Sequence, residues 1–268
     1  MRAMIFAAGL GTRLRPYTDS KPKALVEICG KSLLEWQLER LIYFGFNEIV
    51  INVHHFGEQI EDFAVEYLRR CHHSGVELYI SKEYDLLRDT GGGIKHATSL
   101  LGNGKPFLVH NVDIFSNLNL AEFYRSQSSE MERDSSILAS VLVSGRYSNR
   151  RLLFDRQRRL KGWMNLDSKE VKSPFEEIAN LSYSAQAEKI IEDMGLAPFA
   201  FGGVYLLSPK ALEVMESQPE RFPIVEFYLN NAKQYKIEGA YMENLQLLDV
   251  GKIEQFPQAE KFIREYYL

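Results

Sequence analysis

The chain has 268 residues, 45% of them hydrophobic, and a formal net charge of −4. A chain of this length and composition can bury a large core, either as one domain or as a core with a subdomain. The negative balance argues against a general nucleic-acid-binding protein, because such proteins usually carry a basic surplus. We therefore expect a globular protein that has no nucleic-acid partner.

Cysteine usage and the N-terminal segment indicate a cytoplasmic location. The two cysteines, Cys29 and Cys71, lack metal-ligand spacing and are most simply interpreted as reduced thiols. The apolar stretch near the N-terminus is too short to span a bilayer and lacks the arrangement of a signal peptide. We expect no membrane partner, and we expect His72 and His73 to face solvent.

The first half of the sequence alternates between strand and helix patterns. The predicted order is strand 4–8, helix 33–44, strand 48–53, helix 57–71, strand 76–81, helix 89–101 and strand 106–111. Alternation at this spacing predicts an α/β fold with a doubly wound, mostly parallel sheet. Ligands of such sheets bind beyond the carboxyl ends of the strands.

The second half is less regular. The polar stretch 126–136 predicts a surface loop. The remaining predicted elements are strand 137–143, a hairpin within 145–165, a helix near 185–194, strand 199–207, a helix after Pro209 and a helix from about Ile253. We interpret residues 1–268 as a single domain and residues 145–200 as a region inserted within it. The sequence contains no internal repeat.

The segment from Met4 to Lys23 carries the strongest functional signal. An apolar run predicts a buried strand, and the loop after it contains Gly9 and Gly11. Glycines let a backbone pass close to a ligand, and the exposed N–H groups of such loops bind phosphate oxygens. Arg13 and Lys23 add two positive charges for the same phosphates.

Two other phosphate-binding loops fit this segment poorly. The dinucleotide fingerprint G-x-G-x-x-G requires a third glycine where this chain has Leu14. It also requires an acid after the second strand, which ends here in Asn52, Val53 and His54. A Walker-type loop is excluded because no G-K-[ST] follows the glycines.

The segment resembles the signature of the sugar-1-phosphate nucleotidyltransferase family, G-x-G-T-R-L-x-P-x-T-x-x-x-P-K-x-L. The family usually has a second proline where this chain has Ala24. The resemblance implies a Rossmann-like nucleotidyltransferase fold and Mg²⁺-dependent transfer from an NTP to a sugar 1-phosphate, with release of pyrophosphate. The ten matching positions are Gly9, Gly11, Thr12, Arg13, Leu14, Pro16, Thr18, Pro22, Lys23 and Leu25.

The resemblance also implies roles for this loop. Its backbone, together with the Thr12 side chain, is expected to bind the triphosphate. Arg13 is expected over the α-phosphate, and Lys23 beside either the acceptor phosphate or the α-phosphate. Positioning and electrostatics dominate such transfers, because the protein needs to supply little covalent chemistry. The nucleotide-binding backbone positions are Ala8, Gly9 and Gly11.

Two aspartates are candidate Mg²⁺ ligands. Asp113 follows the strand that ends at Asn111, and the family carries a similar Asn-Gly-Asp triplet with a metal-binding Asp. Val112 replaces the usual glycine, and Asn111 is expected at the nucleotide. Asp249 matches the Asp of the family pattern D-V-G-T, in which Lys252 replaces the threonine. Each aspartate alone is equally typical of a cap or a turn.

A third motif, Asp89-Thr90-Gly91-Gly92-Gly93, opens a predicted helix. Three glycines at a helix start are costly unless something approaches the backbone closely. We expect Asp89 or Thr90 to cap the helix and the free N–H groups to receive a base edge or phosphate. Relatives with Glu-Thr-Gly-Gly-Gly use this segment near the nucleobase, which implies nucleotide binding by Asp89 and Gly92. A flexible capped turn is the alternative.

The acceptor site is less well defined by the sequence. The resemblance implies that residues 145–200 form a sugar-binding subdomain, that Gly203 lies on the strand lining the sugar pocket, and that Asn165 and Trp163 are candidate contacts. The Glu-Lys pair with which some relatives bind the sugar has no clear counterpart. The hexapeptide repeat that builds a β-helix domain in some relatives is absent from the sequence.

Within the family, two subgroups are most similar to the chain. The motif Asp-Thr-Gly-Gly-Gly-Ile and the chain length resemble those of N-acetylmuramate-1-phosphate uridylyltransferases, which use UTP. Mannose-1-phosphate guanylyltransferases, which use GTP, are the next most similar subgroup. Cytidylyltransferases acting on phosphocholine are more distant. A non-catalytic regulatory subunit that binds nucleotide sugars is the alternative from another class. Such subunits tend to lose the cations and aspartates that this chain retains.

Overall fold

The computed structural model describes residues 1–71, 75–181 and 185–268, without the side chains of 185–188. His72 and His73 therefore lie outside the described residues. Within the described residues, no helix combines the length and apolar character needed to cross a bilayer.

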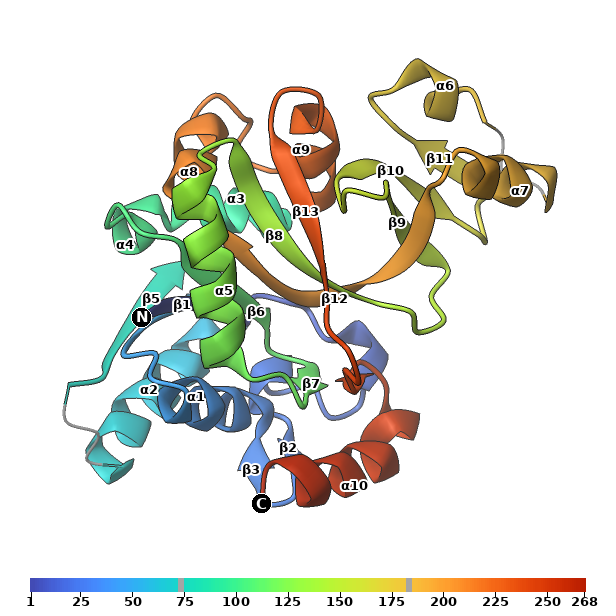
Figure 1. Cartoon of the computed structure of the whole chain (residues 1–268). Coiled ribbons are helices and arrows are strands. Elements are labelled where there is room, and N and C mark those ends of the chain that lie inside the picture. Colours follow the sequence, from blue (N-terminus) through green and yellow to red (C-terminus); the bar gives the residue numbers. More distant parts are fainter. Residues whose placement is uncertain (72–74, 182–184) are drawn as a thin grey trace.

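A parallel sheet forms the centre of the molecule (Figure 1). Its order is β5-β4-β1-β6, and each neighbouring pair is parallel, so Met4 of β1 lies between Val50 and Val109. The α/β prediction is thus confirmed, and all four predicted strands are present within two residues of their expected bounds. These strands are β1 (Arg2–Phe6), β4 (Glu48–Val53), β5 (Glu77–Lys82) and β6 (Phe107–Asn111).

Helices cover both faces of this sheet. Side chains alternate along a strand, so Ala3 and Ile5 pack in one apolar cluster and Met4 packs in another. The first cluster includes residues of α1 (Leu33–Tyr43), α2 (Gly57–Cys71), α5 (Leu120–Arg133) and α10 (Phe256–Tyr266). The second includes residues of α3 (Asp89–His96), α4 (Thr98–Leu101), α8 (Pro209–Met215) and α9 (Ile224–Asn231). The predicted doubly wound arrangement is confirmed.

One long strand, β12 (Ala197–Leu207), joins the central sheet to the strands of residues 145–200 (Figure 1). Its last residues pair antiparallel with β6 and with β8 (Ile137–Ser144), while its first residues pair with β9. A register shift between Phe201 and Tyr205 bends the strand, and Gly203 there has φ +72°. On the other side, β8 pairs in parallel with β13 (Lys236–Tyr241).

The region 145–200 has its own small sheet and core. The predicted hairpin is confirmed as β9 (Arg150–Phe154) and β10 (Leu160–Asn165), with β11 (Glu170–Lys172) added antiparallel. Two helices, α6 (Glu176–Ala179) and α7 (Ala185–Asp193), follow. A separate apolar cluster packs between these elements and consists of Leu153, Met164, Ile178, Ile191 and Leu196.

The predicted surface loop at 126–136 is wrong. The helix α5 continues to Arg133, and Gln127 and Ser128 are buried on its inner face. Gln127 lies one turn from both Phe123 and Met131, so it occupies the apolar stripe of the helix. Its side-chain oxygen accepts a hydrogen bond from the Ser140 hydroxyl of β8, which satisfies a polar group that the sequence suggested was exposed.

Several short elements complete the described fold. Two of them, β7 and β14, pair with each other antiparallel and lie beside the site described below. The predicted C-terminal helix begins as a 3₁₀ turn before α10. The short elements are η1 (Thr12–Leu14), η2 (Lys23–Leu25), β2 (Glu27–Ile28), β3 (Lys31–Ser32), β7 (Ile114–Ser116), β14 (Leu247–Asp249) and η3 (Ile253–Gln255).

The three glycines of α3 are required by the packing of the chain against itself. A Cβ on Gly91 would lie closer than 3.0 Å to the Phe222 side chain, and one on Gly92 would be as close to the Glu220 carbonyl oxygen. The N–H groups of Gly91 and Gly92 donate to the Phe222 carbonyl, at 2.9 and 3.1 Å. The predicted free N–H groups are therefore occupied, and no side chain caps α3.

This packing predicts that Gly92→Ala destabilises the fold. The new methyl group would meet a backbone carbonyl, which cannot move aside as a side-chain tip can, and overpacking of this kind costs about 1–3 kcal/mol. Chemical denaturation should show that loss. Gly145→Ala is the matched control, since a Cβ there meets nothing within 4 Å. Equal stability of the two variants would contradict the packing role.

Candidate active site

A pocket of about 350 Å³ lies beyond the carboxyl ends of β1, β4 and β6. It brings together six residues singled out from the sequence, namely Ala8, Gly9, Lys23, Asp89, Asn111 and Asp113. The other lining residues are Phe6, Ala7, Asn52, Glu83, Leu87, Thr90, Val112 and Arg221. The glycine loop and Asp113 therefore share the carboxyl edge of the sheet, where ligands of doubly wound sheets are expected to bind.

The glycine loop is held open by a tight turn. Gly11 has φ +64°, and a Cβ there would lie 2.9 Å from the Thr18 Cγ2 atom and 3.0 Å from Lys23 Cβ. The Thr18 hydroxyl donates to the Gly11 carbonyl oxygen at 2.9 Å. Within the described part of the chain, nothing accepts a hydrogen bond from the N–H groups of Gly9 and Gly11. These two amides are available to phosphate oxygens.

Asn52 anchors the start of this loop. Its side-chain oxygen accepts hydrogen bonds from the N–H groups of Ala7 and Ala8, at 3.0 and 3.4 Å. The expected phosphate-binding amide of Ala8 is thus engaged within the protein. The Asn52 amide donates to one oxygen of the fully buried Glu83 at 2.7 Å, and Arg88 N–H donates to the other at 3.0 Å. The ends of β1 and β4 are therefore tied to the segment that leads into α3.

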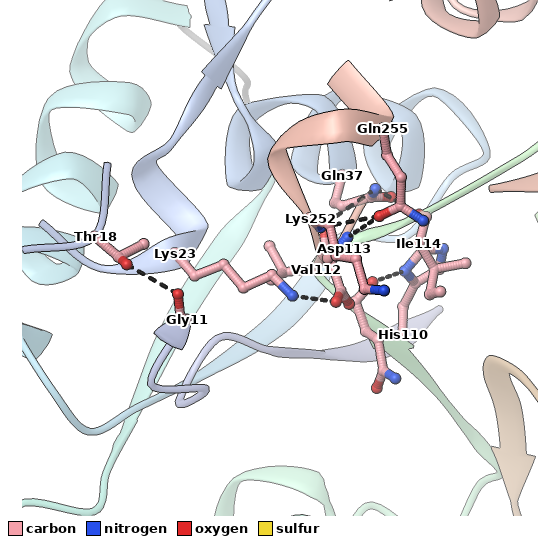
Figure 2. A network of polar contacts seen from close by, with 12 residues as sticks. Gly11, Thr18, Lys23, Gln37, His110, Val112, Asp113, Ile114, Lys252 and Gln255 are labelled. Atoms are coloured by element: carbon pink, nitrogen blue, oxygen red, sulfur yellow. Dashed lines mark hydrogen bonds and ion pairs between the residues drawn. The ribbon is translucent and has the colours of Figure 1, made fainter. Parts of the chain in front are cut away.

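The turn that carries Asp113 is fixed by hydrogen bonds from Gln37 of α1 (Figure 2). The buried Gln37 amide donates to the Ile114 carbonyl at 2.8 Å and to the Val112 carbonyl at 3.4 Å. Lys23 extends across the pocket and forms an ion pair with Asp113, as Figure 2 shows. The two side chains are only 11% and 16% exposed, so this pair is partly screened from water.

Asp249 reaches the same place through the pairing of β7 with β14. It lies opposite Ile114, and Val250 N–H donates to the Asp113 carbonyl at 2.8 Å. The Asp249 Oδ1 atom is buried and has no hydrogen-bond partner among the described residues. Burial raises the pKa of this carboxyl, the Asp113 carboxylate raises it further, and Lys23, Arg13 and Arg146 act in the opposite direction.

Arg13 lies next to this aspartate. A Cβ on Gly251 would be 2.8 Å from Asp249 Oδ1 and 2.9 Å from a guanidinium nitrogen of Arg13, so both groups converge on the Gly251 backbone. The sequence therefore needs glycine at this position. Arg13 and Thr12 are exposed and lie outside the lining of the 350 Å³ pocket.

Two cations near the site were missed by the sequence analysis. Arg146 follows β8 and donates to the Phe201 carbonyl at 3.2 Å, close enough to influence the Asp249 carboxyl. The position of Arg146 just after the end of a predicted strand could have marked it as a candidate site residue. Arg221 lines the pocket because its segment docks on the glycines of α3. No local pattern in the sequence indicates that docking.

The two aspartates fit a magnesium ion. Mg²⁺ prefers oxygen ligands and is usually held by one or two carboxylates together with substrate phosphates. The unpartnered Oδ1 of Asp249 beside Asp113 is such an arrangement. Larger sets, of three or more His, Cys, Asp or Glu placed for a metal, do not occur in the described residues. Substrate oxygens or water would complete the coordination.

A second pocket, of about 460 Å³, lies between the β9–β11 sheet and α9. Asp89 and Thr90 line both pockets, so the two are adjacent. Trp163, a candidate sugar contact in the sequence analysis, lines the second pocket. The remaining lining residues are Ser148, Arg150, Arg151, Leu152, Lys172, Phe201, Pro223, Val225, Glu226 and Leu229.

Two of the three residues expected at the sugar, Asn165 and Gly203, lie outside both pockets. Asn165 accepts a hydrogen bond from Asp167 N–H at 3.0 Å, so its side chain closes a local turn. Gly203 is buried in the bend of β12, where a Cβ would lie 2.7 Å from Ile114 and 3.1 Å from the Asn111 amide nitrogen. Its structural role is thus to let Asn111 and Ile114 approach the strand.

Comparison with known proteins places the chain in a family. A sequence model described as nucleotidyl transferase matches residues 2–148, more than half of the chain. The chain belongs to the nucleotidyl transferase family. The matched residues include the glycine loop, Asp113 and Arg146, but not Asp249 or most of the inserted region.

Individual relatives share shorter segments. The N-acetylmuramate alpha-1-phosphate uridylyltransferase of Caulobacter vibrioides is 46% identical over 113 residues, which cover 41% of this chain and 45% of that protein. The mannose-1-phosphate guanylyltransferase catalytic subunit beta of Dictyostelium discoideum is 35% identical over 133 residues, which cover 48% of this chain and 36% of that protein. The chain therefore spans less than half the length of each of these curated relatives.

The fold is shared much more widely. The solved structure of a UDP-glucose pyrophosphorylase from Acinetobacter baumanii superimposes with a TM-score of 0.70, covering 98% of this chain and 92% of that one. Its sequence is 18% identical. At that identity the likeness concerns the fold, and it extends over the inserted region as well as the central sheet.

The anchoring role of Asn52 predicts that Asn52→Ala destabilises the protein. The variant leaves two loop amides and one Glu83 oxygen without their partner in a buried place, at a cost of about 1–3 kcal/mol. Denaturant unfolding measures this loss. Asn103→Ala serves as the control, because Asn103 is exposed and accepts one hydrogen bond from Lys105 N–H. A loss no larger than that of the control would contradict the anchoring role.

Proposed function

We propose that this protein catalyses Mg²⁺-dependent nucleotidyl transfer from an NTP to a sugar 1-phosphate, giving an NDP-sugar and pyrophosphate. The convergence of Lys23, Arg13, Asp113 and Asp249 from four segments of the chain carries this proposal. Two free loop amides and a second, adjacent pocket supply places for the triphosphate and for the acceptor. Two relatives named as sugar-phosphate nucleotidyltransferases support it.

The proposed reaction is an in-line displacement at the α-phosphorus. An oxygen of the acceptor phosphate forms the new bond, and pyrophosphate leaves with the electron pair of the bond that breaks. Negative charge on the α-phosphate oxygens increases during this step, so fixed cations lower the barrier. We assign that role to Arg13 and Lys23. Lys23 already forms an ion pair with Asp113, so phosphate oxygens compete with a carboxylate for its ammonium group.

Asp113 and Asp249 would hold the magnesium ion. When bound, the ion would neutralise phosphate charge and orient the triphosphate. The protein's own contribution is to keep the two carboxylates together through the β7–β14 pairing and the Gln37 hydrogen bonds. We assign the nucleotide to the 350 Å³ pocket, whose lining includes Gly9, Asp89 and Asn111. Gly11 and Thr12, in the same loop as Gly9, are assigned to its phosphates.

The proposed substrate pairs follow the relatives. They are UTP with N-acetylmuramate 1-phosphate and GTP with mannose 1-phosphate. Such soluble substrates fit a cytoplasmic enzyme. The presence of both cations and both aspartates disfavours a regulatory subunit that only binds nucleotide sugars.

The test of the proposal is pyrophosphate release with Mg²⁺, across UTP, GTP, CTP, ATP and dTTP combined with a panel of sugar 1-phosphates. Release that requires one particular pair of substrates supports the proposal and identifies both. Absence of pyrophosphate release with every pair, together with clear binding of a nucleotide sugar, would overturn the proposal in favour of a regulatory subunit.

The proposed role of Arg13 predicts that Arg13→Ala lowers kcat by about 10²-fold or more, because one preorganised donor to developing charge contributes roughly 3 kcal/mol. Arg15→Ala is the control in the same loop, since Arg15 is exposed and pairs with Asp19 at 3.4 Å. Initial rates at saturating substrates measure the effect. Near-normal turnover of Arg13→Ala would refute the role.

The proposed metal site predicts that Asp113→Ala abolishes Mg²⁺-dependent turnover, as chelation with EDTA does in the unaltered protein. Asp62→Ala, which removes an exposed carboxylate of α2, should behave like the unaltered protein. Circular dichroism checks that both variants are folded. Turnover of folded Asp113→Ala at the normal rate would show that the metal site is misplaced.

A further inference from the structure

We propose that the 460 Å³ pocket selects a sugar 1-phosphate that carries a carboxylate, and that Arg150 binds this carboxylate. The inference rests on the proposed function, because it assigns the acceptor to this pocket. It goes further by choosing acidic over neutral acceptor sugars and by naming the residue that makes the choice.

The pocket has an apolar floor suited to a sugar ring. Leu152 of β9 lies opposite Trp163 of β10, and Phe201 of β12 adjoins them in the lining. Pro223, Val225 and Leu229, in or beside α9, form the facing wall. Aromatic faces pack well against the C–H groups of a ring, so these surfaces leave the polar groups of the ring to the rim.

Three cations line this pocket, and two of them are already engaged. Lys172 pairs with Glu170 at 3.3 Å and with Glu226 at 3.8 Å, and its ammonium lies over the Trp163 ring. Arg151 donates from Nε to the Ser148 carbonyl at 2.9 Å, and its guanidinium lies over the ring of a neighbouring tyrosine. These contacts hold both side chains in place within the protein.

Arg150 is the cation that remains available. Arg150 is exposed, and its hydrogen bonds within the described residues are made by its backbone N–H and carbonyl with the Ser148 hydroxyl, which leaves the guanidinium unpaired. Side chains alternate along β9, so Arg150 projects from the same face as Leu152. A free guanidinium beside an apolar floor is suited to bidentate binding of a carboxylate.

The reacting phosphate is not the partner of Arg150. Lys23, one of the two cations assigned to phosphate, lines the 350 Å³ pocket and not the 460 Å³ pocket, whereas Arg150 lines only the latter. Asp89 and Thr90 lie at the junction of the two pockets. An acceptor bound with its phosphate toward Lys23 therefore presents a different part of the sugar to Arg150. A negative group on that part matches the unpaired cation.

The experiment compares acceptors that differ in one carboxylate. N-acetylmuramate 1-phosphate is measured against N-acetylglucosamine 1-phosphate, which lacks the lactyl group, and glucuronate 1-phosphate against glucose 1-phosphate. Pyrophosphate release gives kcat and KM for each with the preferred NTP. We expect kcat/KM to favour the acidic member of at least one pair by about tenfold or more, since charge-assisted bidentate pairs are strong.

Arg150→Gln tests the residue. The variant should lose about tenfold in kcat/KM for the acidic acceptor, through KM rather than kcat, and leave the neutral acceptor unchanged. Arg125→Gln, which removes an exposed arginine of α5, is the matched control and should change neither value. A variant that lost stability would lower kcat/KM for the acidic and the neutral acceptor alike. The ratio of the two kcat/KM values therefore distinguishes lost stability from lost recognition.

Two results would overturn the inference while the proposed function stands. One is equal or better turnover of the neutral acceptors by the unaltered protein. The other is an acidic preference that Arg150→Gln leaves intact. Absence of pyrophosphate release with every acceptor would instead contradict the proposed function itself.

Discussion

The charged part of the site depends on the pairing of two three-residue strands, β7 and β14. Asp113 precedes β7, and Asp249 ends β14, so their antiparallel pairing sets the two carboxylates side by side. The Asp113 carboxylate disfavours the charged form of Asp249, and burial disfavours it as well. Lys23, Arg13 and Arg146 offset these effects, and bound cations and phosphates would change the same balance. The stability of the two carboxylates therefore depends on the cations around them.

The central sheet and the first half of the site were predictable from the sequence. Parallel strands must end at a common edge, so the glycine loop after β1 and Asp113 after β6 had to meet. Gly11 had to be glycine because of its positive φ and its contact with Thr18. Such constraints act within short segments or follow from strand order, and both leave a pattern in the residues.

The remainder required the folded chain. The glycines of α3 indicated a close approach, but the approaching group is the segment 220–222 rather than a ligand, and this segment brings Arg221 to the pocket. The helix α9 was not predicted because it is short and is stabilised by tertiary packing. The strand β13 was not predicted because it contains Glu238 and Gly239, residue types that are depleted in strands. The polar half of α5 was mistaken for a loop because the Gln127 side-chain oxygen accepts its hydrogen bond from Ser140, which lies outside the helix on β8. Partners distant in sequence decide all these features.

The most direct test of nucleotidyl transfer is the fate of oxygen in the acceptor phosphate. The protein is incubated with Mg²⁺, the NTP and a sugar 1-phosphate whose phosphate oxygens are ¹⁸O. Mass spectrometry then measures the masses of the nucleotide sugar and the pyrophosphate. Attack of an acceptor oxygen on the α-phosphorus predicts that the nucleotide sugar retains all the label and that pyrophosphate contains none. Label in pyrophosphate, or absence of a nucleotide sugar with every substrate pair, would contradict the account.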